Sequence, residues 1–275
     1  MTPPASFALH TITSLSLDPH FPLFQHYPAM KLGVRESVRF YVDLLAPLAG
    51  NIMASEPETI EWVVTAPPLY VIPAGANLLA WEISRRLSLR AVDLLYSSPN
   101  PRRQDFTSSG EYSRSGIAER IENRRRLFEG VWAPCPDPAD FRDRAVLVIN
   151  DINVTGTQQR FMQRALETLH PATIRWLYLF QVDPALGSAH PEIESSLNHL
   201  NLESFEELAE IVARADLDYT WRCIARLLNH PEAVLKPFLR SLHPTRRETL
   251  DRLILREGAY PEEGDQAKLA LLREP

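Results

Sequence analysis

The sequence predicts an α/β fold in which helices flank a parallel β-sheet, followed by a C-terminal helical appendage. Three observations predict it. Residues 145–149 form a continuous apolar run, Ala-Val-Leu-Val-Ile, which is typical of a central parallel strand covered on both faces. Strand and helix patterns alternate through the first two thirds of the chain, as they do in βαβ units. The last hundred residues show helical spacing instead.

The alternating elements can be placed along the chain by their apolar spacing and by the proline clusters between them. Helices are expected at 35–48, 77–87 and 158–169. Strands are expected at 60–65, 91–96, 145–149 and 173–180. Because strands and helices alternate from 60 to 180, we expect the strands to lie parallel in one sheet.

The C-terminal region shows helix-start signals without strand patterns. Ser204 and Glu207 have the spacing of a capping box, and so have Thr245 and Glu248. Gly258 is placed to close the helix that Thr245 would open. Further helices are expected at 221–228 and 233–242. We therefore expect residues 186–275 to form the helical appendage.

Composition limits the classes of function. The net charge of −6 and a pI near 5.8 argue against general nucleic-acid binding, because contacts with many phosphates need a basic surface. The two cysteines, Cys135 and Cys223, have no metal-binding spacing. No signal peptide and no apolar run of about 18 to 20 residues is visible. We expect a cytoplasmic protein without a membrane partner.

The most informative segment follows the central strand. Asn150 and Asp151 stand where that strand is expected to end, and a Thr-Gly-Thr turn leads into the next helix. Ligands of open α/β sheets bind beyond the carboxyl ends of the strands. Free amides and the dipole at a helix start favour a phosphate, and Asp151 can accept hydrogen bonds from sugar hydroxyls. The predicted phosphate-binding residues are Val154, Thr155, Gly156, Thr157 and Gln158.

This segment resembles the phosphoribosyl-pyrophosphate-binding motif of type I phosphoribosyltransferases, in which a hydrophobic strand precedes two acidic residues and a Thr-Gly-containing phosphate loop. The resemblance implies that Asp151 and Asn150 are the catalytic residues that contact the ribose hydroxyls, while the loop wraps the 5-phosphate. Two positions depart from the motif. Asn150 replaces the first acid, and Gln158 stands where a threonine is usual.

The resemblance covers about residues 58–182 and implies two further loops. A pyrophosphate loop is implied at Pro73, Ala74, Gly75, Ala76 and Asn77. A long loop over the substrate is implied at 99–130, with Tyr112, Arg114 and Arg120 among its polar residues. The chain would then divide into an N-terminal segment forming part of a hood (1–57), the α/β core (58–185) and the helical appendage (186–275).

Three functions are open at this stage. The first is an enzyme that moves a phosphoribosyl group from its pyrophosphate to an acceptor, such as a nitrogenous base, or runs in reverse. The second is a sensor of phosphoribosyl pyrophosphate or a nucleoside monophosphate, suggested by the loss of an acid at Asn150. The third is an interaction module of a stress or defence system. Mg²⁺ would be carried mainly by the ligand phosphates, with no protein ligand directly assigned. A homodimer is expected on general grounds alone.

Each signal also has an ordinary explanation. Asn, Asp and Thr are common caps and turn formers at any strand–helix junction. The segment from Tyr70 to Asn77 could be a plain proline-rich connection, and the arginine-rich loop a solvated surface. Lys31 is expected to be a solvated lysine. The eight histidines show no metal-binding spacing.

Overall fold

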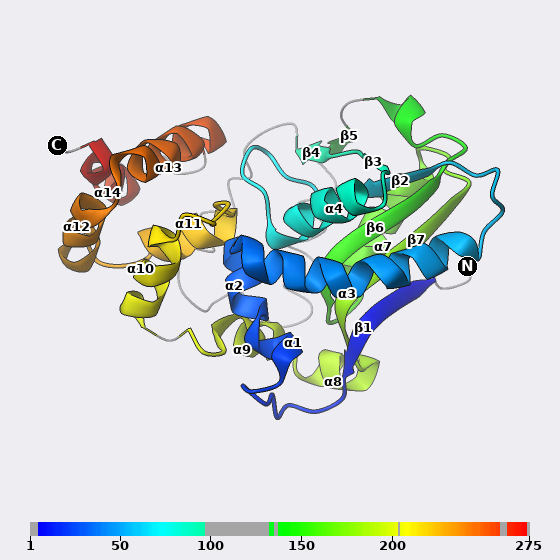
Figure 1. Ribbon diagram of the computed structural model, residues 1–275, viewed down its shortest axis with the longest axis horizontal. Coiled ribbons are helices and arrows are strands. Elements are labelled where there is room, and N and C mark those ends of the chain that lie inside the picture. Colours follow the sequence, from blue (N-terminus) through cyan, green and yellow to red (C-terminus); the bar gives the residue numbers. More distant parts are fainter. Residues whose placement is uncertain (1–4, 97–131, 135–136, 203, 259–262, 274–275) are drawn as a thin grey trace.

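A parallel β-sheet forms the centre of the protein. Figure 1 shows a computed structural model of the chain, which describes residues 5–96, 132–134, 137–202, 204–258 and 263–273. The sheet contains β1 (Ser6–Ile12), β2 (Trp62–Thr65), β3 (Arg90–Ala91), β6 (Ala145–Asn153) and β7 (Thr173–Val182). All neighbouring strands are parallel, in the order β1-β7-β6-β2-β3. Every residue of β6 is buried, so the predicted fold class is confirmed.

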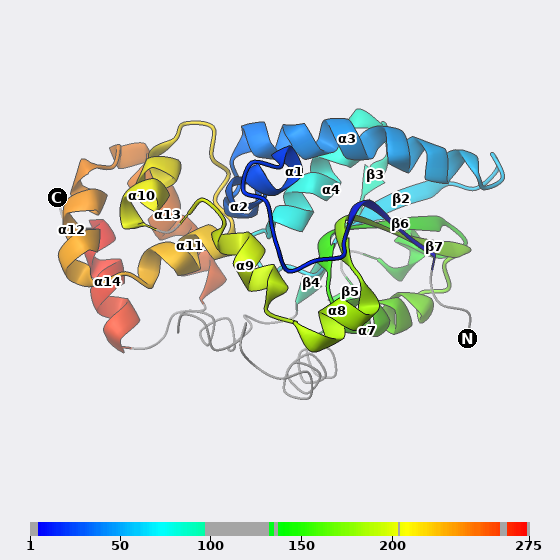
Figure 2. The ribbon, with the colours of Figure 1, turned by 90° about the horizontal axis from the view of Figure 1, so that it is seen from below.

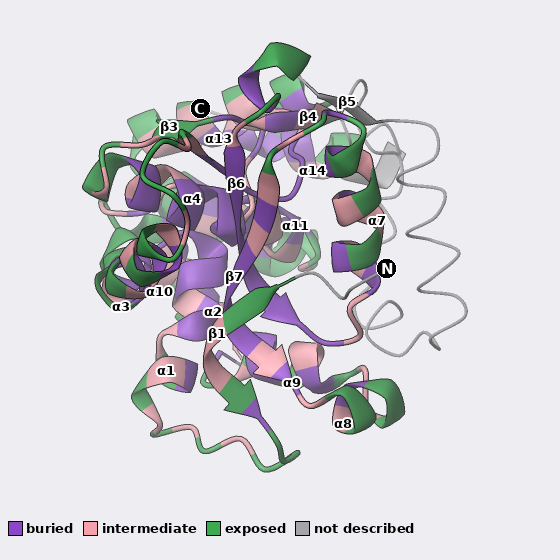
Figure 3. Cartoon of the chain, turned by 90° about the vertical axis from the view of Figure 1, so that its right-hand side faces the viewer, coloured by how far each residue is buried: buried purple, intermediate pink, exposed green. Residues whose placement is uncertain are grey.

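Helices cover both faces of this sheet. Figure 2 shows α3 (Arg35–Ala54) and α4 (Gly75–Arg86) on one side and α7 (Thr157–Glu167) on the other. Successive side chains of a strand point to opposite faces. Leu147 and Ile149 accordingly pack with α3 and α4, while Val146 and Val148 pack with α7. Burial of both faces explains why β6 reads as an unbroken apolar run (Figure 3).

The prediction of one continuous strand at 91–96 is wrong. The chain forms β3 and then β4 (Leu94–Tyr96), which leaves the main sheet and pairs antiparallel with β5 (Trp132–Pro134). Asp93 lies at the break, and its carboxylate accepts a 2.7 Å hydrogen bond from the indole of Trp81. Aspartate is a poor strand former, and its partner on α4 holds the backbone away from the sheet. A short 3-10 helix, η2 (Pro138–Asp140), precedes β6.

The N-terminal segment contributes to the core. It was expected at 1–57 as part of the hood, yet β1 forms the sheet edge beside β7, with Ser6 opposite Trp176. Ile12 is the buried residue of β1, so this strand lacks an apolar signature. Two short helices follow, α1 (Pro22–Gln25) and α2 (Tyr27–Leu32). The long helix α3 then continues past the predicted end at 48 and through Pro47.

Seven described helices follow the sheet: the first two, α8 and α9, pack against the first core through Leu186, Ile193 and Leu197, and the other five form a second hydrophobic core. The seven are α8 (Pro184–Ala189), α9 (Ile193–His199), α10 (Phe205–Ala213), α11 (Trp221–Leu228), α12 (Glu232–Ser241), α13 (Pro244–Glu257) and α14 (Glu263–Arg273). Leu208, Ile224, Leu235 and Leu250 lie in this core. Figure 1 shows α10–α14 gathered at one end of the molecule. Leu32 packs in the same core, so α2 joins the two parts. No described helix is both long and apolar enough to cross a bilayer.

The two predicted capping boxes have different outcomes. Ser204 caps α10: its hydroxyl accepts the Glu207 amide at 3.2 Å, and the Glu207 carboxylate accepts the Ser204 amide at 2.9 Å. The box at Thr245 is wrong, because α13 begins one residue earlier, at Pro244. Proline is pre-set for the first helical position, where its missing N–H costs nothing. Gly258 closes α13 with a φ of +63°, as predicted.

These caps predict a difference between two matched substitutions. Ser204→Ala removes a hydroxyl that satisfies a helix-start amide, so it should lower the free energy of unfolding by about 1 kcal/mol. Thr245→Ala removes the same group from a position that caps nothing, and it should have a smaller effect. Urea unfolding of both variants measures the difference. Equal losses would contradict the assigned start of α13.

Candidate functional site

The predicted ligand segment lies where β6 meets α7. Strand β6 runs to Asn153, four residues past the predicted end at Ile149, so Asn150 and Asp151 lie within the strand. These residues pair with β7, with Asn150 opposite Tyr178. The pairing with β2 ends at Val148, so β7 alone extends β6 beyond the apolar run. Helix α7 begins at Thr157, and Gly156 before it has a φ of +69°. The positive φ explains the glycine, because other residues rarely adopt it.

Side chains hold the turn between β6 and α7. The Gly156 amide donates to the Asn153 side-chain oxygen at 2.9 Å. The hydroxyls of Thr155 and Thr157 lie 2.9 Å apart. Arg160 donates to the Thr155 carbonyl (3.3 Å) and the Thr157 hydroxyl (3.1 Å). The turn therefore brings two hydroxyls and a guanidinium together at a helix start.

The amides of this turn are partly engaged. That of Gly156 is used by Asn153, and that of Thr157 reaches the Thr155 hydroxyl only at 3.4 Å. The amides of Gln158 and Gln159 belong to the first turn of α7, which has no preceding helical carbonyl to accept them. An arrangement of this kind suits an anion. Phosphate binding at Val154–Gln158 remains a prediction.

Asn150 and Asp151 are both buried at the end of β6. The Asn150 side-chain oxygen accepts the Asp151 amide at 2.9 Å, and its amide group approaches the Gln158 side chain at 3.4 Å. One carboxylate oxygen of Asp151 accepts the Ile152 amide at 2.8 Å. The two residues are thus fixed by local hydrogen bonds.

The other carboxylate oxygen of Asp151 forms an ion pair with Lys31 of α2. The expectation of a solvated lysine is wrong, because Lys31 is only 8% exposed. Burial on its own would raise the pKa of the Asp151 carboxyl. The charge and hydrogen bond of Lys31, with the Ile152 amide, outweigh burial and lower that pKa below its ordinary value. Asp151 is therefore held as a carboxylate in a buried position.

The ion pair extends into a charged cluster of Lys31, Asp151, Glu194 and Arg222. The Lys31 ammonium lies 3.8 Å from the carboxylate of Glu194 on α9. That carboxylate lies 3.9 Å from the guanidinium of Arg222 on α11. The four formal charges balance. The charged cluster connects the end of β6 with the helices on either side of it, and the sequence pattern gives no sign of it.

Two tyrosine hydroxyls near Asp151 are buried without a hydrogen-bond partner in the described structure. They belong to Tyr27 on α2 and Tyr178 on β7. Burial, and then the charge of Asp151, raise the pKa of both phenols, so they stay protonated. The Lys31 ammonium also lies 5.4 Å from the centre of the Tyr27 ring. A buried hydroxyl without a partner is costly, and these two are candidate contacts for a polar ligand.

The predicted pyrophosphate loop lies against α2. Its backbone is fixed by Asn77, whose side chain accepts the Ala74 amide at 2.8 Å and donates to the Pro67 carbonyl at 2.9 Å. A Cβ atom on Gly75 would lie 2.8 Å from Met30 Sδ and 3.3 Å from Lys31 Cα. Glycine therefore permits the close approach of α4 to α2. In this way α2 contacts both the start of the predicted pyrophosphate loop and, through Lys31, the end of β6.

A carboxylate from the C-terminal helices fixes the residues before this loop. One oxygen of Glu257, the last residue of α13, accepts the amides of Val71 (3.0 Å) and Ile72 (2.8 Å). Glu257 is almost fully buried. The next carbonyl along, that of Pro73, accepts the amide of Trp221 on α11 at 3.0 Å. Two helices of the predicted appendage thus hold the approach to the predicted loop.

Some predicted residues cannot be compared with the structure, and some residues of the site were not predicted. Tyr112, Arg114 and Arg120 lie outside the described residues. Lys31, Arg160 and Glu257 were not predicted as site residues. Arg160 could have been found one turn into the predicted helix, three residues after Thr157. Lys31 and Glu257 meet partners 120 and 185 or more residues away, which local patterns do not report.

Comparison with known proteins supports the resemblance. The family model described as PRTase ComF-like matches residues 135–260. A comparison with curated proteins gives no match. The matched segment contains η2, β6, α7, β7 and the helices α8 to α13, so it extends beyond the range of the predicted resemblance. Together with the parallel sheet and the motif at the end of β6, this match supports the chain as a member of the type I phosphoribosyltransferase family, ComF-like over residues 135–260.

Proposed function

We propose that this protein binds phosphoribosyl pyrophosphate at the end of β6 and transfers its phosphoribosyl group to a nitrogenous base. One observation carries the proposal. The buried carboxylate of Asp151 stands shortly before a helix start that presents the Thr155 and Thr157 hydroxyls and the Arg160 guanidinium. A ribose ring with its 5-phosphate has the hydroxyls and the anion to match both.

Each group would take one part of the ligand. Asp151 would accept hydrogen bonds from the ribose hydroxyls. The turn Val154–Gln158 and Arg160 would hold the 5-phosphate, and residues Pro73–Asn77 would face the pyrophosphate. In the reaction the bond from C1 to the pyrophosphate oxygen breaks, and pyrophosphate leaves with the electron pair. The base nitrogen forms the new bond to C1 and releases its proton.

The residues near Asp151 would accommodate Mg²⁺ only if the ligand itself supplied most of the coordinating oxygens. Both oxygens of Asp151 already have partners, the Ile152 amide and Lys31. No group of three His, Cys, Asp or Glu side chains in the described parts of the chain could hold a metal. The ion would then be held by phosphate and ribose oxygens, as Mg²⁺ prefers. It would supply charge neutralisation for the leaving pyrophosphate.

Lys31 would have a role in binding. Its ammonium is buried beside Asp151, and its backbone adjoins Gly75 at the start of the predicted pyrophosphate loop. A highly charged ligand entering here would draw the ammonium toward its phosphates, and Asp151 would be freed to accept ribose hydroxyls. The cost of breaking the ion pair would be offset by the new contacts of both groups.

A second function is favoured by the charges at the end of β6. Asn150 provides no charge, and Lys31 balances that of Asp151. Stabilisation of a cationic ribosyl centre at C1 calls for negative charge at this point. A protein that binds phosphoribosyl pyrophosphate as a sensor, without transfer, needs no such charge.

Binding and turnover separate these two functions. The full chain is titrated with phosphoribosyl pyrophosphate and Mg²⁺ while its thermal unfolding is followed. At about 100 times the dissociation constant, the ligand should add about 2.7 kcal/mol of stability. Pyrophosphate release with a panel of bases would then indicate the transferase, and binding without release the sensor. Absence of any stabilisation would contradict both.

Two matched threonines at the two ends of α7 provide a test of the phosphate site. Thr157→Val removes a buried hydroxyl at the helix start and should weaken binding of phosphoribosyl pyrophosphate by about tenfold or more, because a hydrogen bond to a charged group is lost. Thr168→Val removes an exposed hydroxyl just beyond the other end of α7 and should leave binding unchanged. Titration calorimetry of both variants gives the comparison. Equal affinities would place the phosphate elsewhere.

The Lys31–Asp151 pair predicts a pH-dependent loss of stability. In the wild type the pKa of Asp151 lies below its unfolded value of about 3.9, so the pair stabilises the fold above that pH and its contribution is lost as pH falls through the lower, folded-state pKa. In Lys31→Met, burial alone would raise that pKa, so stability should fall as pH rises. The variant should therefore lose up to about 3–5 kcal/mol near neutral pH and less near about pH 4.

Urea unfolding at both pH values measures this loss. The control is Lys31→Met combined with Asp151→Leu, which removes both charges and should recover most of the stability near neutral pH. A loss that is the same at the two pH values, or that persists in the double variant, would show that the pair is not the cause.

A further inference from the structure

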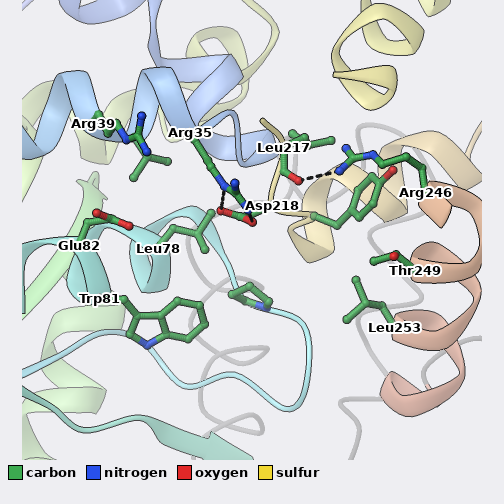
Figure 4. Close-up of a pocket in the computed structure, with 13 residues that line it drawn as sticks. Arg35, Arg39, Leu78, Trp81, Glu82, Leu217, Asp218, Arg246, Thr249 and Leu253 are labelled. Atoms are coloured by element: carbon green, nitrogen blue, oxygen red, sulfur yellow. Dashed lines mark hydrogen bonds and ion pairs between the residues drawn. The ribbon is translucent and has the colours of Figure 1, made fainter. Parts of the chain in front are cut away.

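A cavity of about 490 Å³ lies away from the end of β6. Figure 4 shows its walls, which come from α3, α4, the segment 217–219 and α13. None of residues 150–158 lines it. Its volume is within the range of small-molecule sites, which are about 300–1,000 Å³. The cavity is therefore a candidate site distinct from the predicted phosphate turn after β6.

One part of the cavity wall is apolar. Leu78 and Trp81 come from α4, and Leu253 faces them from α13 (Figure 4). The Trp81 indole N–H donates to Asp93 at 2.7 Å, which fixes the orientation of the ring. A fixed indole beside leucine side chains offers a flat surface for an aromatic ring.

The charges of the wall do not balance. Arg35 makes two hydrogen bonds to the carboxylate of Asp218, at 2.8 and 2.6 Å, so these two charges are paired. Glu82 pairs with Arg85, which is outside the lining. The two remaining guanidinium groups of the cavity, those of Arg39 and Arg246, have no carboxylate partner among the described residues.

These two arginines differ in their surroundings. Arg39 is exposed and makes no ion pair in the described structure. Arg246 donates to the carbonyls of Leu217 (3.1 Å) and Val212 (3.3 Å). Its Nε is buried and has no acceptor, and its guanidinium lies 4.5 Å from the Tyr219 ring centre. A buried donor without an acceptor is a position at which an incoming anion would gain a hydrogen bond.

We propose that this cavity binds a small aromatic anion, a flat ring carrying one carboxylate or a similar group. The ring would lie against Trp81 and the leucines, and the anionic group would meet the Arg39 guanidinium, which has no ion pair among the described residues. Such a ligand would contact α3 and α4 of the core together with α13. Pro73 also lines the cavity, so the ligand would adjoin the first residue of the predicted pyrophosphate loop.

The proposal is tested on the full chain with 1-naphthoate as the probe and the uncharged 1-naphthalenemethanol as its comparison. Binding is followed by Trp fluorescence and by ligand-observed NMR. The wild type should bind the carboxylate at least several-fold more tightly than the alcohol. Arg39→Gln should weaken naphthoate binding on the order of three- to tenfold, because it removes a charge facing the anion.

The matched control for charge is Arg142→Gln. Arg142 is also exposed and without an ion pair in the described structure, but it does not line the cavity, so its variant should bind as the wild type does. Thr249→Trp fills the cavity from α13 and should abolish binding, with folding checked by circular dichroism. If that variant does not fold, Thr249→Phe replaces it.

Three results would overturn the proposal: no binding of naphthoate by the wild type, equal binding of acid and alcohol, or unchanged binding in a folded cavity-filling variant. The cavity shares Pro73, and none of residues 150–158, with the proposed phosphoribosyl site. Failure of the proposed function would leave naphthoate binding intact, so the two ideas fail separately.

Discussion

The buried ion pair of Lys31 and Asp151 is the interaction on which the arrangement of the candidate site depends. A carboxylate at the end of a buried strand needs a charged or hydrogen-bonded partner, because an isolated buried charge is very costly. Lys31 supplies it from α2, which Gly75 allows to approach α4 closely. Glu194 and Arg222 then connect the same charges to α9 and α11. A single electrostatic requirement thus links the sheet, the N-terminal helices and the C-terminal helices.

The C-terminal helices contribute directly to the region around the predicted site. Glu257 at the end of α13 binds two amides that precede the predicted pyrophosphate loop, and Trp221 binds the Pro73 carbonyl. The family match also continues through these helices as far as residue 260. A rearrangement of α13 would therefore change both the loop and the cavity that it lines.

Local patterns in the sequence predicted a large part of the fold. The apolar run of β6, the Thr-Gly-Thr turn and the Ser204 capping box each depend on neighbours within a few residues, and each is found. The features that the sequence did not predict depend on partners that are distant in the chain. Lys31 meets a carboxylate 120 residues away, and β1 has little apolar periodicity because only Ile12 is buried. The strand at 91–96 divides because Asp93 bonds to Trp81 on α4.

A crystal structure of the protein with phosphoribosyl pyrophosphate and Mg²⁺ would test the account most directly. The account predicts the 5-phosphate at Thr155–Gln158, the ribose hydroxyls on Asp151, and the Lys31 ammonium moved toward the ligand phosphates. The contrary result would be a ligand bound elsewhere, with the turn before α7 empty of any anion and Lys31 still paired only with Asp151.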